Sequence, residues 1–192
     1  MEAIELRNMR IKQLVATNIL GISAFAIYLI ALSIFEITFM QFYLALGLLL
    51  FIQGVYGLLK GNSTKSIFPI FEKVAIYEKQ KMGKEWYKQR KAGYTGNIVI
   101  SILFFSLAFL NRNSTTENFQ VDYLFMTIIL VIALVLLNIS LAIHMAKVDR
   151  STSAMEFKGY TWKSYLIGIV IGLIIAMVII VFTFYYIISS IV

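Results

Sequence analysis

Long apolar stretches separated by short polar ones make up most of the chain. Residues 14–59 carry a single charge, Glu36. At about 1.5 Å per residue, one helix of that length would far exceed a bilayer core of about 30 Å. A turn near Glu36 is therefore predicted, with one span at 14–34 and another at 39–59. The later apolar stretches predict three more spans, at 94–110, 123–146 and 164–188.

The composition agrees with this pattern. The chain is 60% hydrophobic and only 14% charged, with one proline, which is far from the balance of a soluble domain. We expect an all-α, polytopic membrane protein whose residues 1–192 form a single integral membrane domain. Its first apolar stretch lacks a small-residue cleavage site and reads as a retained anchor. The absence of cysteine excludes disulfides, thiolate metal sites and thiol catalysis.

The segment 60–93 is the one long polar region between the predicted spans. It holds nine of the seventeen Lys and Arg residues against three acids. Ile67, Ile70, Phe71 and Val74 share a helix face, so we expect a basic amphipathic segment forming two short helices on the membrane surface. An ordinary solvated loop is the alternative. The candidate residues for binding anionic lipid or a protein partner are Lys73, Lys79, Lys81, Lys84, Trp86, Lys88, Arg90 and Lys91.

The basic residues also predict an orientation. Sixteen of the seventeen lie in 1–13, 60–93 and 147–163, and only Arg112 falls elsewhere. Because cytoplasmic segments of membrane proteins retain Lys and Arg, the N-terminus is expected in the cytoplasm and the C-terminus outside. The abundance of Ile, Lys, Asn, Phe and Tyr is typical of an AT-rich bacterial genome, so the expected location is a bacterial cytoplasmic membrane.

Small residues recur at helical spacing in the first, second and fifth spans. They matter because apolar side chains give membrane helices no preference for each other over lipid, whereas small residues let backbones approach. Packing within the chain is the first interpretation, self-association the second and a ligand groove the third. The candidate packing residues are Gly47, Gly54, Gly168, Gly172 and Ala176.

Several polar side chains fall inside the spans. Hydrogen bonding between helices is the simplest role for them, and a polar pathway is the alternative. The candidates for such a pathway are Asn97, Ser101, Asn138 and His144. His144 lies in the last turn of the fourth span, where a cation complements the carboxyl end of a helix.

No catalytic motif of the common hydrolases, nucleotide-binding proteins or metalloenzymes is present in the sequence. We expect no cofactor and no metal site. The predicted function is that of a non-enzymatic accessory or regulatory membrane protein, binding anionic lipid or a cytoplasmic protein through its basic segment. An oligomeric channel or small transporter, assembled through the glycine-striped helices, is the alternative, and a membrane enzyme is a third. Specific nucleic acid binding is not expected, because the basic segment lies beside the membrane.

Overall fold

The computed structural model describes residues 3–35, 37–113 and 123–191, and this part of the chain is almost entirely helical. Side chains are described as far as residue 181, apart from those of Phe125 and Ile179. The elements in chain order are α1 (Ala3–Ile34), α2 (Phe39–Lys60), α3 (Pro69–Met82), α4 (Lys84–Leu110), α5 (Tyr123–Arg150), the short 3-10 helix η1 (Ala154–Phe157) and α6 (Tyr160–Ile191).

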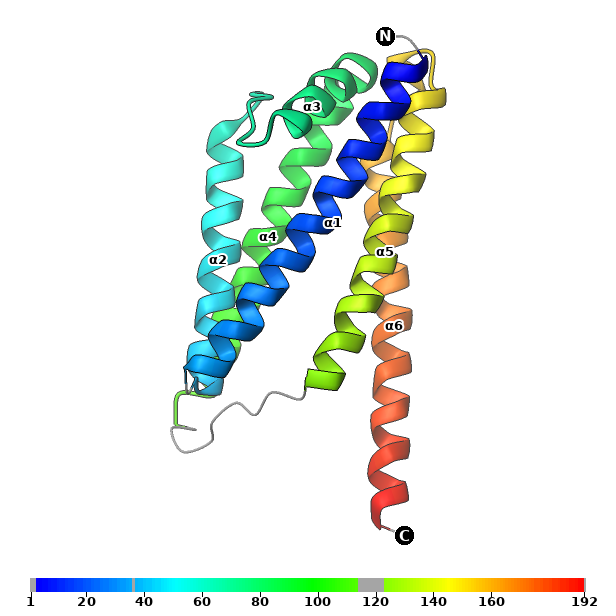
Figure 1. The fold of residues 1–192 in the computed structure, drawn as a ribbon. Coiled ribbons are helices and arrows are strands. Elements are labelled where there is room, and N and C mark those ends of the chain that lie inside the picture. The colour runs from blue at the N-terminus through cyan, green and yellow to red at the C-terminus, as the bar shows by residue number, and fades with distance from the viewer. Residues whose placement is uncertain (1–2, 36, 114–122, 192) are drawn as a thin grey trace.

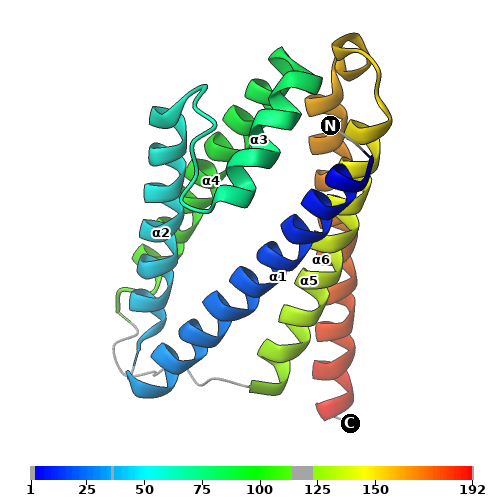
Figure 2. The same cartoon turned by 45° about the horizontal axis from the view of Figure 1, so that its top comes forward.

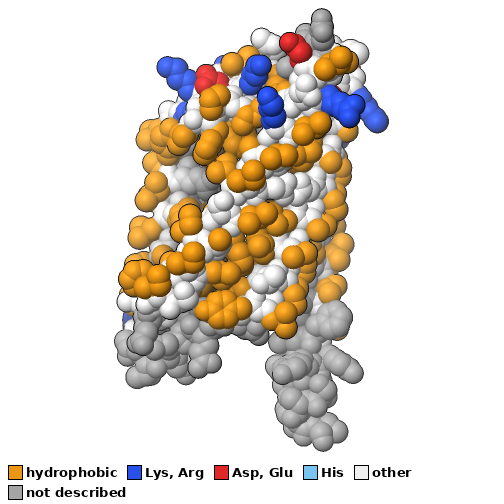
Figure 3. Space-filling model, viewed as in Figure 1, with side chains coloured by type: hydrophobic (Ala, Val, Ile, Leu, Met, Phe, Trp, Pro, Cys, Tyr) orange, Lys and Arg blue, Asp and Glu red, His pale blue; other side chains and the backbone are white. Residues whose placement is uncertain are grey.

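Within the described residues, five helices are long and apolar enough to cross a membrane: α1, α2, α4, α5 and α6. The expected all-α fold with five spanning helices is confirmed. The sides of the bundle expose apolar side chains throughout, as a surface facing lipid should (Figure 3). The predicted turn near residue 36 is also present, because α1 ends at Ile34 and Thr38 begins α2 with a capping box to Gln41.

The long helices run alternately up and down. The start of α1, the end of α2, all of α3 and the start of α4 therefore lie at the same end of the molecule as the turn from α5 to α6 (Figure 1). Lys and Arg side chains gather there (Figure 3), and we term it the basic end. The three basic segments of the sequence are thus brought together by the topology.

The segment 60–93 differs from the expectation in its second half. Its first half forms one short helix, α3, as predicted. The predicted second surface helix is wrong, because residues from Lys84 onward belong to α4, which continues without a break to Leu110. Gly83 separates the two helices with a φ of +59°, in the left-handed region that glycine adopts without strain. Figure 2 shows α3 beside the start of α4.

The tightest helix pair is α2 with α4, and glycines make the close approach possible. A Cβ atom added at Gly54 would lie 2.9 Å from the backbone oxygen of Tyr94 and 2.6 Å from the Ile98 side chain. One added at Gly47 would lie 2.7 Å from the Phe105 ring. Gly47 and Gly54 therefore lie where α2 and α4 approach each other closely.

The expectation of packing within the chain is wrong for the glycines of α6. A Cβ atom added at Gly168 or Gly172 would meet nothing within 4 Å, and Ala176 is exposed. The reason is that α6 contacts α4 near its own start, where Thr161 and Tyr165 bond to Glu85 and Gln89. Among the described residues, Gly168 and Gly172 instead line an open groove between α6 and α5.

The buried core is small and lies at the basic end. Met82, Trp86, Val148 and Phe157 form it, each at most 3% exposed, and they come from α3, α4, α5 and η1. Ser153 caps η1 and forms a capping box with Glu156, which orients the turn that delivers Phe157 to this cluster. This cluster therefore ties two of the basic segments, 60–93 and 147–163, to each other rather than filling the membrane part of the bundle.

Candidate functional site

An arginine of α1 is the centre of the charged groups at the basic end. Arg10 has a side chain only 8% exposed, and it lies between acids of α3 and α5. Its Nη1 donates to Glu78 Oε1 at 2.9 Å and to Gln13 Oε1 at 2.8 Å. Its Nη2 donates to Asp149 Oδ1 at 2.7 Å, and its Nε lies 3.2 Å from Asp149 Oδ2. Such a two-pronged contact is the strongest geometry between a guanidinium and a carboxylate.

The network continues from Glu78 into α5 and α6. His144 Nε2 lies 3.4 Å from Glu78 Oε1, and His144 Nδ1 lies 3.0 Å from the Tyr160 hydroxyl. Burial alone would raise the pKa of Glu78. Hydrogen bonds and charges from His144 and Arg10 outweigh it, so the pKa of Glu78 lies below its ordinary value. Glu78 is therefore held as a carboxylate. We term the side chains joined in this way the Arg10 network.

The members of the Arg10 network are Arg10, Gln13, Glu78, His144, Asp149 and Tyr160. They come from α1, α3, α5 and α6, so the network joins four helices through charged and polar side chains. Both of its carboxylates are engaged by Arg10. The arrangement neutralises buried acids and holds the helices in register, which is a structural role.

Sequence reasoning did not find this network. In the sequence, Glu78 interrupts the apolar face of α3. Arg10 and Asp149 are simply charged residues of the first and third basic segments, and nothing in the sequence pairs them. The one available signal was an acid placed among the apolar positions of an amphipathic helix. Its partners Arg10 and His144 lie 68 and 66 positions away in the chain, and only the packing of α1 and α5 against α3 brings them together.

A second feature of the basic end is a groove of about 650 Å³, which we term the lysine groove. It is formed by the end of α3, the start of α4 and the chain that follows α2. The described residues of its lining include four basic side chains and no carboxylate: Asn62, Lys79, Gly83, Lys84, Tyr87, Lys88 and Lys91. Four of the predicted partner or lipid residues are thus gathered in one place.

Two of these lysines have contacts within the chain. Lys79 Nζ donates to the Asn62 backbone oxygen at 2.8 Å, which closes one side of the groove. Lys88 Nζ pairs with Glu85 Oε1 at 2.8 Å, but the Glu85 side chain is buried and also accepts a hydrogen bond from the Thr161 hydroxyl. Within the described residues, Lys84 and Lys91 form no ion pair. The groove therefore keeps an excess of positive charge.

The other predicted binding residues lie elsewhere. Trp86 is 3% exposed in the core, so it is not part of an exposed surface that binds lipid or a partner. The reason is that α4 begins before it and turns its ring against Phe157 and Met82. Lys81 donates to the Ser151 backbone oxygen at 2.9 Å, and Lys73 is exposed on α3.

The polar residues of the spans have separate neighbours. Asn18 of α1 and Asn138 of α5 exchange two amide hydrogen bonds, both 2.8 Å long. Asn97 of α4 donates to Gln53 of α2 at 3.3 Å. Ser101 is fully buried and donates to the Ile98 backbone oxygen at 2.7 Å. The four residues considered for a polar pathway, including His144 in the Arg10 network, are therefore not gathered along one route.

The helices and their lipid-facing surface define the class of this chain, a multi-pass α-helical membrane protein. Comparison with known protein families, with curated proteins and with solved structures gives no match.

Proposed function

We propose that this chain is a non-enzymatic accessory protein of a bacterial cytoplasmic membrane, and that its lysine groove docks an acidic segment of a cytoplasmic protein. The observation that carries the proposal is the groove itself, in which Lys79, Lys84, Lys88 and Lys91 line one surface without a carboxylate. The orientation rests on the distribution of basic residues, since the end of a membrane protein that is rich in Lys and Arg faces the cytoplasm.

The distance of the groove from the apolar core of the bilayer favours a protein segment over a lipid headgroup as the ligand. Residues 92–110 of α4 are uncharged, and at about 1.5 Å per residue they span about 28 Å, close to the core of a bilayer. Lys91 then lies at the edge of the core, and Lys84 lies about 10 Å beyond it. Headgroups fill only about 5–7 Å on each side of a bilayer, so Lys84 reaches past them.

A role in binding rather than catalysis is also supported by the contacts of three acids at the basic end. Glu78 and Asp149 are bound to Arg10, and Glu85 is bound to Lys88 and Thr161. General acid-base chemistry needs a group that is free to exchange a proton with a substrate. These three carboxylates serve instead to join helices.

The test uses the full chain in nanodiscs of neutral phosphatidylcholine and a fluorescent octaglutamate peptide as the acidic probe. We expect saturable binding that weakens as salt is raised, because exposed charges are screened. The triple variant Lys84→Glu, Lys88→Glu and Lys91→Glu should weaken binding by about tenfold or more, since each exposed ion pair contributes about 0.2–1 kcal/mol.

The matched control carries the same change in net charge at exposed positions outside the groove: Lys12→Glu, Lys73→Glu and Arg150→Glu. It should bind the peptide nearly as well as the unaltered chain. Equal losses of peptide binding in the two triple variants would show that only the net charge matters, and would contradict binding at the lysine groove. If nanodiscs with phosphatidylglycerol abolish peptide binding, and the groove variants lose bound phosphatidylglycerol, the groove is a lipid site instead.

A further inference from the structure

A separate cavity of about 530 Å³ lies at the basic end, beneath the chain that joins α2 to α3. Side chains of α1, α3 and α4 and the last residue of α2 line it. Its volume falls within the range of about 300–1,000 Å³ that is usual for small-molecule sites. It shares no lining residue with the lysine groove. We term it the loop cavity.

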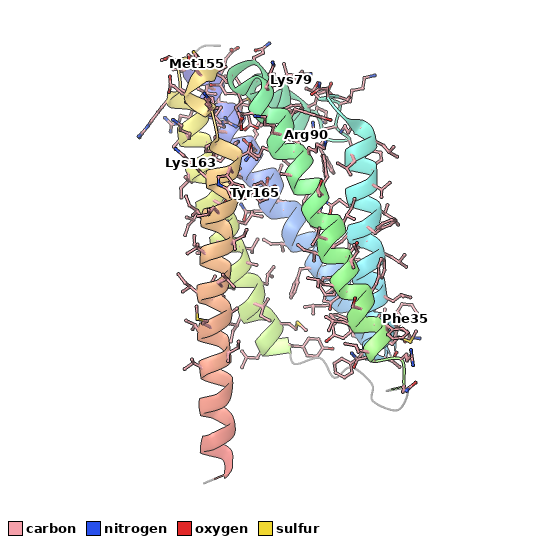
Figure 4. All side chains as sticks on the ribbon, turned by 180° about the vertical axis from the view of Figure 1, so that it is seen from behind. Phe35, Lys79, Arg90, Met155, Lys163 and Tyr165 are labelled. Atoms are coloured by element: carbon pink, nitrogen blue, oxygen red, sulfur yellow. The ribbon has the colours of Figure 1, made fainter. Side chains whose placement is uncertain are left out.

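Arg90 is the feature of the loop cavity that points to a ligand. Its side chain is partly buried, and Figure 4 shows it on α4 below Lys79. Its Nη1 donates to the Ser63 backbone oxygen at 2.8 Å, and its Nη2 donates to the Tyr94 hydroxyl at 2.9 Å. The guanidinium also lies 4.5 Å from the centre of the Trp86 ring. All of these partners are neutral.

Arg90 differs from Arg10 in having no carboxylate partner among the described residues. Arg10 is bound to two carboxylates, whereas no carboxylate of the described residues lies within ion-pair distance of Arg90. A guanidinium has five N–H donors, and the hydrogen bonds of Arg90 use two of its nitrogens. A charge withdrawn from water is stabilised by a counter-ion, and the cavity is the space in which one fits.

The remaining lining gives the rest of the ligand's chemistry. Lys60 and Lys65 add two positive charges, and neither forms an ion pair within the described residues. Glu78, the one acid in the lining, is held by Arg10. Phe71 and Val74 supply an apolar wall.

The cavity also extends toward the apolar part of the bundle. Asn97 lines it and lies six residues along α4 from Lys91, which is about 9 Å deeper on a helix. The positive groups at Lys60, Lys65 and Arg90 thus lie near the polar end of the span, and the cavity continues inward from them.

We propose that the loop cavity binds an amphiphile that carries a phosphate group joined to an apolar portion, with Arg90 as the principal anion-binding residue. The guanidinium fork matches the geometry of phosphate oxygens, and Lys60 and Lys65 add charge at the same end. The source of this chemistry is either a phospholipid of the surrounding leaflet or a soluble organophosphate. Basic pockets between membrane helices bind anionic headgroups in this way.

The chain itself supplies the probe. Trp86 lines the cavity, and the second tryptophan, Trp162, is exposed and can be replaced by phenylalanine. Fluorescence of the Trp162→Phe protein in neutral detergent then reports on Trp86 alone. Four compounds are titrated: dioctanoyl phosphatidic acid, dioctanoylglycerol, phenyl phosphate and inorganic phosphate.

We expect a saturable change with dioctanoyl phosphatidic acid and none with dioctanoylglycerol, which has the same chains without the phosphate. Stronger binding of phenyl phosphate than of the lipid would assign the site to a soluble organophosphate, and the reverse order would assign it to the leaflet. An equal response to dioctanoylglycerol and to phosphatidic acid would overturn the proposal, because the anion would then contribute nothing.

Variants locate the binding. Arg90→Gln and the double variant Lys60→Gln with Lys65→Gln should each weaken phosphatidic acid binding by about tenfold. The matched control, Lys12→Gln with Lys73→Gln, should leave it unchanged. If Arg90→Gln does not fold because Arg90 stacks on Trp86, the lysine pair decides the question. Undiminished binding in the lysine pair would overturn the proposal.

The groove triple variant separates this proposal from the proposed function. It should lose octaglutamate binding and keep phosphatidic acid binding, since the two sites share no residue. Loss of phosphatidic acid binding in that variant would place the ligand in the lysine groove and contradict the loop cavity.

Discussion

Single residues at the basic end show how strongly burial changes the role of a charge. Arg10 and Arg7 lie one turn apart on α1, yet Arg7 is exposed and Arg10 is buried against Glu78 and Asp149. A buried ion pair adds little stability compared with well-packed apolar groups. Removing one partner is costly, however, because the other charge stays buried without compensation.

Replacement of Arg10 by glutamine is therefore expected to lower the free energy of unfolding by about 3–5 kcal/mol. Unfolding of the purified chain by denaturing detergent, followed by circular dichroism, measures the change. Arg7→Gln is the matched control and should change the stability by less than about 0.5 kcal/mol. Equal stability of the two variants would show that the Arg10 network contributes nothing to the fold.

At the scale of helices, glycine has two different roles in this chain. In α2 it allows the backbone of α4 to approach, and an added side chain at Gly54 would meet backbone atoms that cannot move aside easily. In α6 the same residue type faces open space at Gly168 and Gly172. Regular small-residue spacing is present in both helices, so the spacing alone does not tell which face is packed.

Gly54→Leu should accordingly destabilise the chain by about 1–3 kcal/mol or more, as overpacking does. Gly168→Leu, its matched control, should leave the stability of the isolated chain unaltered. The same unfolding measurement compares the two variants. A large loss of stability in Gly168→Leu, together with a change in oligomeric state by light scattering, would show that this face of α6 packs against a second copy.

The start of α4 at Lys84 determines where its basic residues lie. Because α4 begins at Lys84, it carries a basic extension beyond the apolar part of the bundle instead of a separate helix lying on the membrane. This extension forms one side of the lysine groove and places Arg90 in the loop cavity. Both proposed sites therefore depend on the continuity of one helix.

For the molecule as a whole, the gathering of basic residues at one end predicts a fixed orientation in the membrane. The chain has no cysteine, so single cysteines introduced at Lys73 and Asn113 can be labelled without background. Both positions are exposed, and they lie at opposite ends of the bundle.

In intact cells, an impermeant thiol reagent should react with the cysteine at position 113 and leave the one at position 73 unmodified. Permeabilised cells provide the control, because both positions should then react. Labelling at position 73 in intact cells would reverse the orientation and remove the cytoplasmic partner from the proposed function.

The sequence by itself determined the number of spanning helices, because a bilayer of fixed thickness requires an apolar stretch of a certain length. It also determined that the basic segments lie at one end, since each span reverses the direction of the chain. The turn before α2 and the cap of η1 were readable from local residues such as Ser153, because capping acts over three or four positions.

Only the tertiary structure decided which polar residues meet. Arg10 finds Glu78 and Asp149 through the packing of three helices that are distant in the chain, and no local pattern encodes such a pairing. The packing also buried Trp86 and separated the packed glycines from the open ones. Among the described residues, it left Arg90 without a carboxylate within ion-pair distance. The physical reason is that lipid accepts any apolar helix face equally, so which faces pack and which stay open is set by contacts between helices.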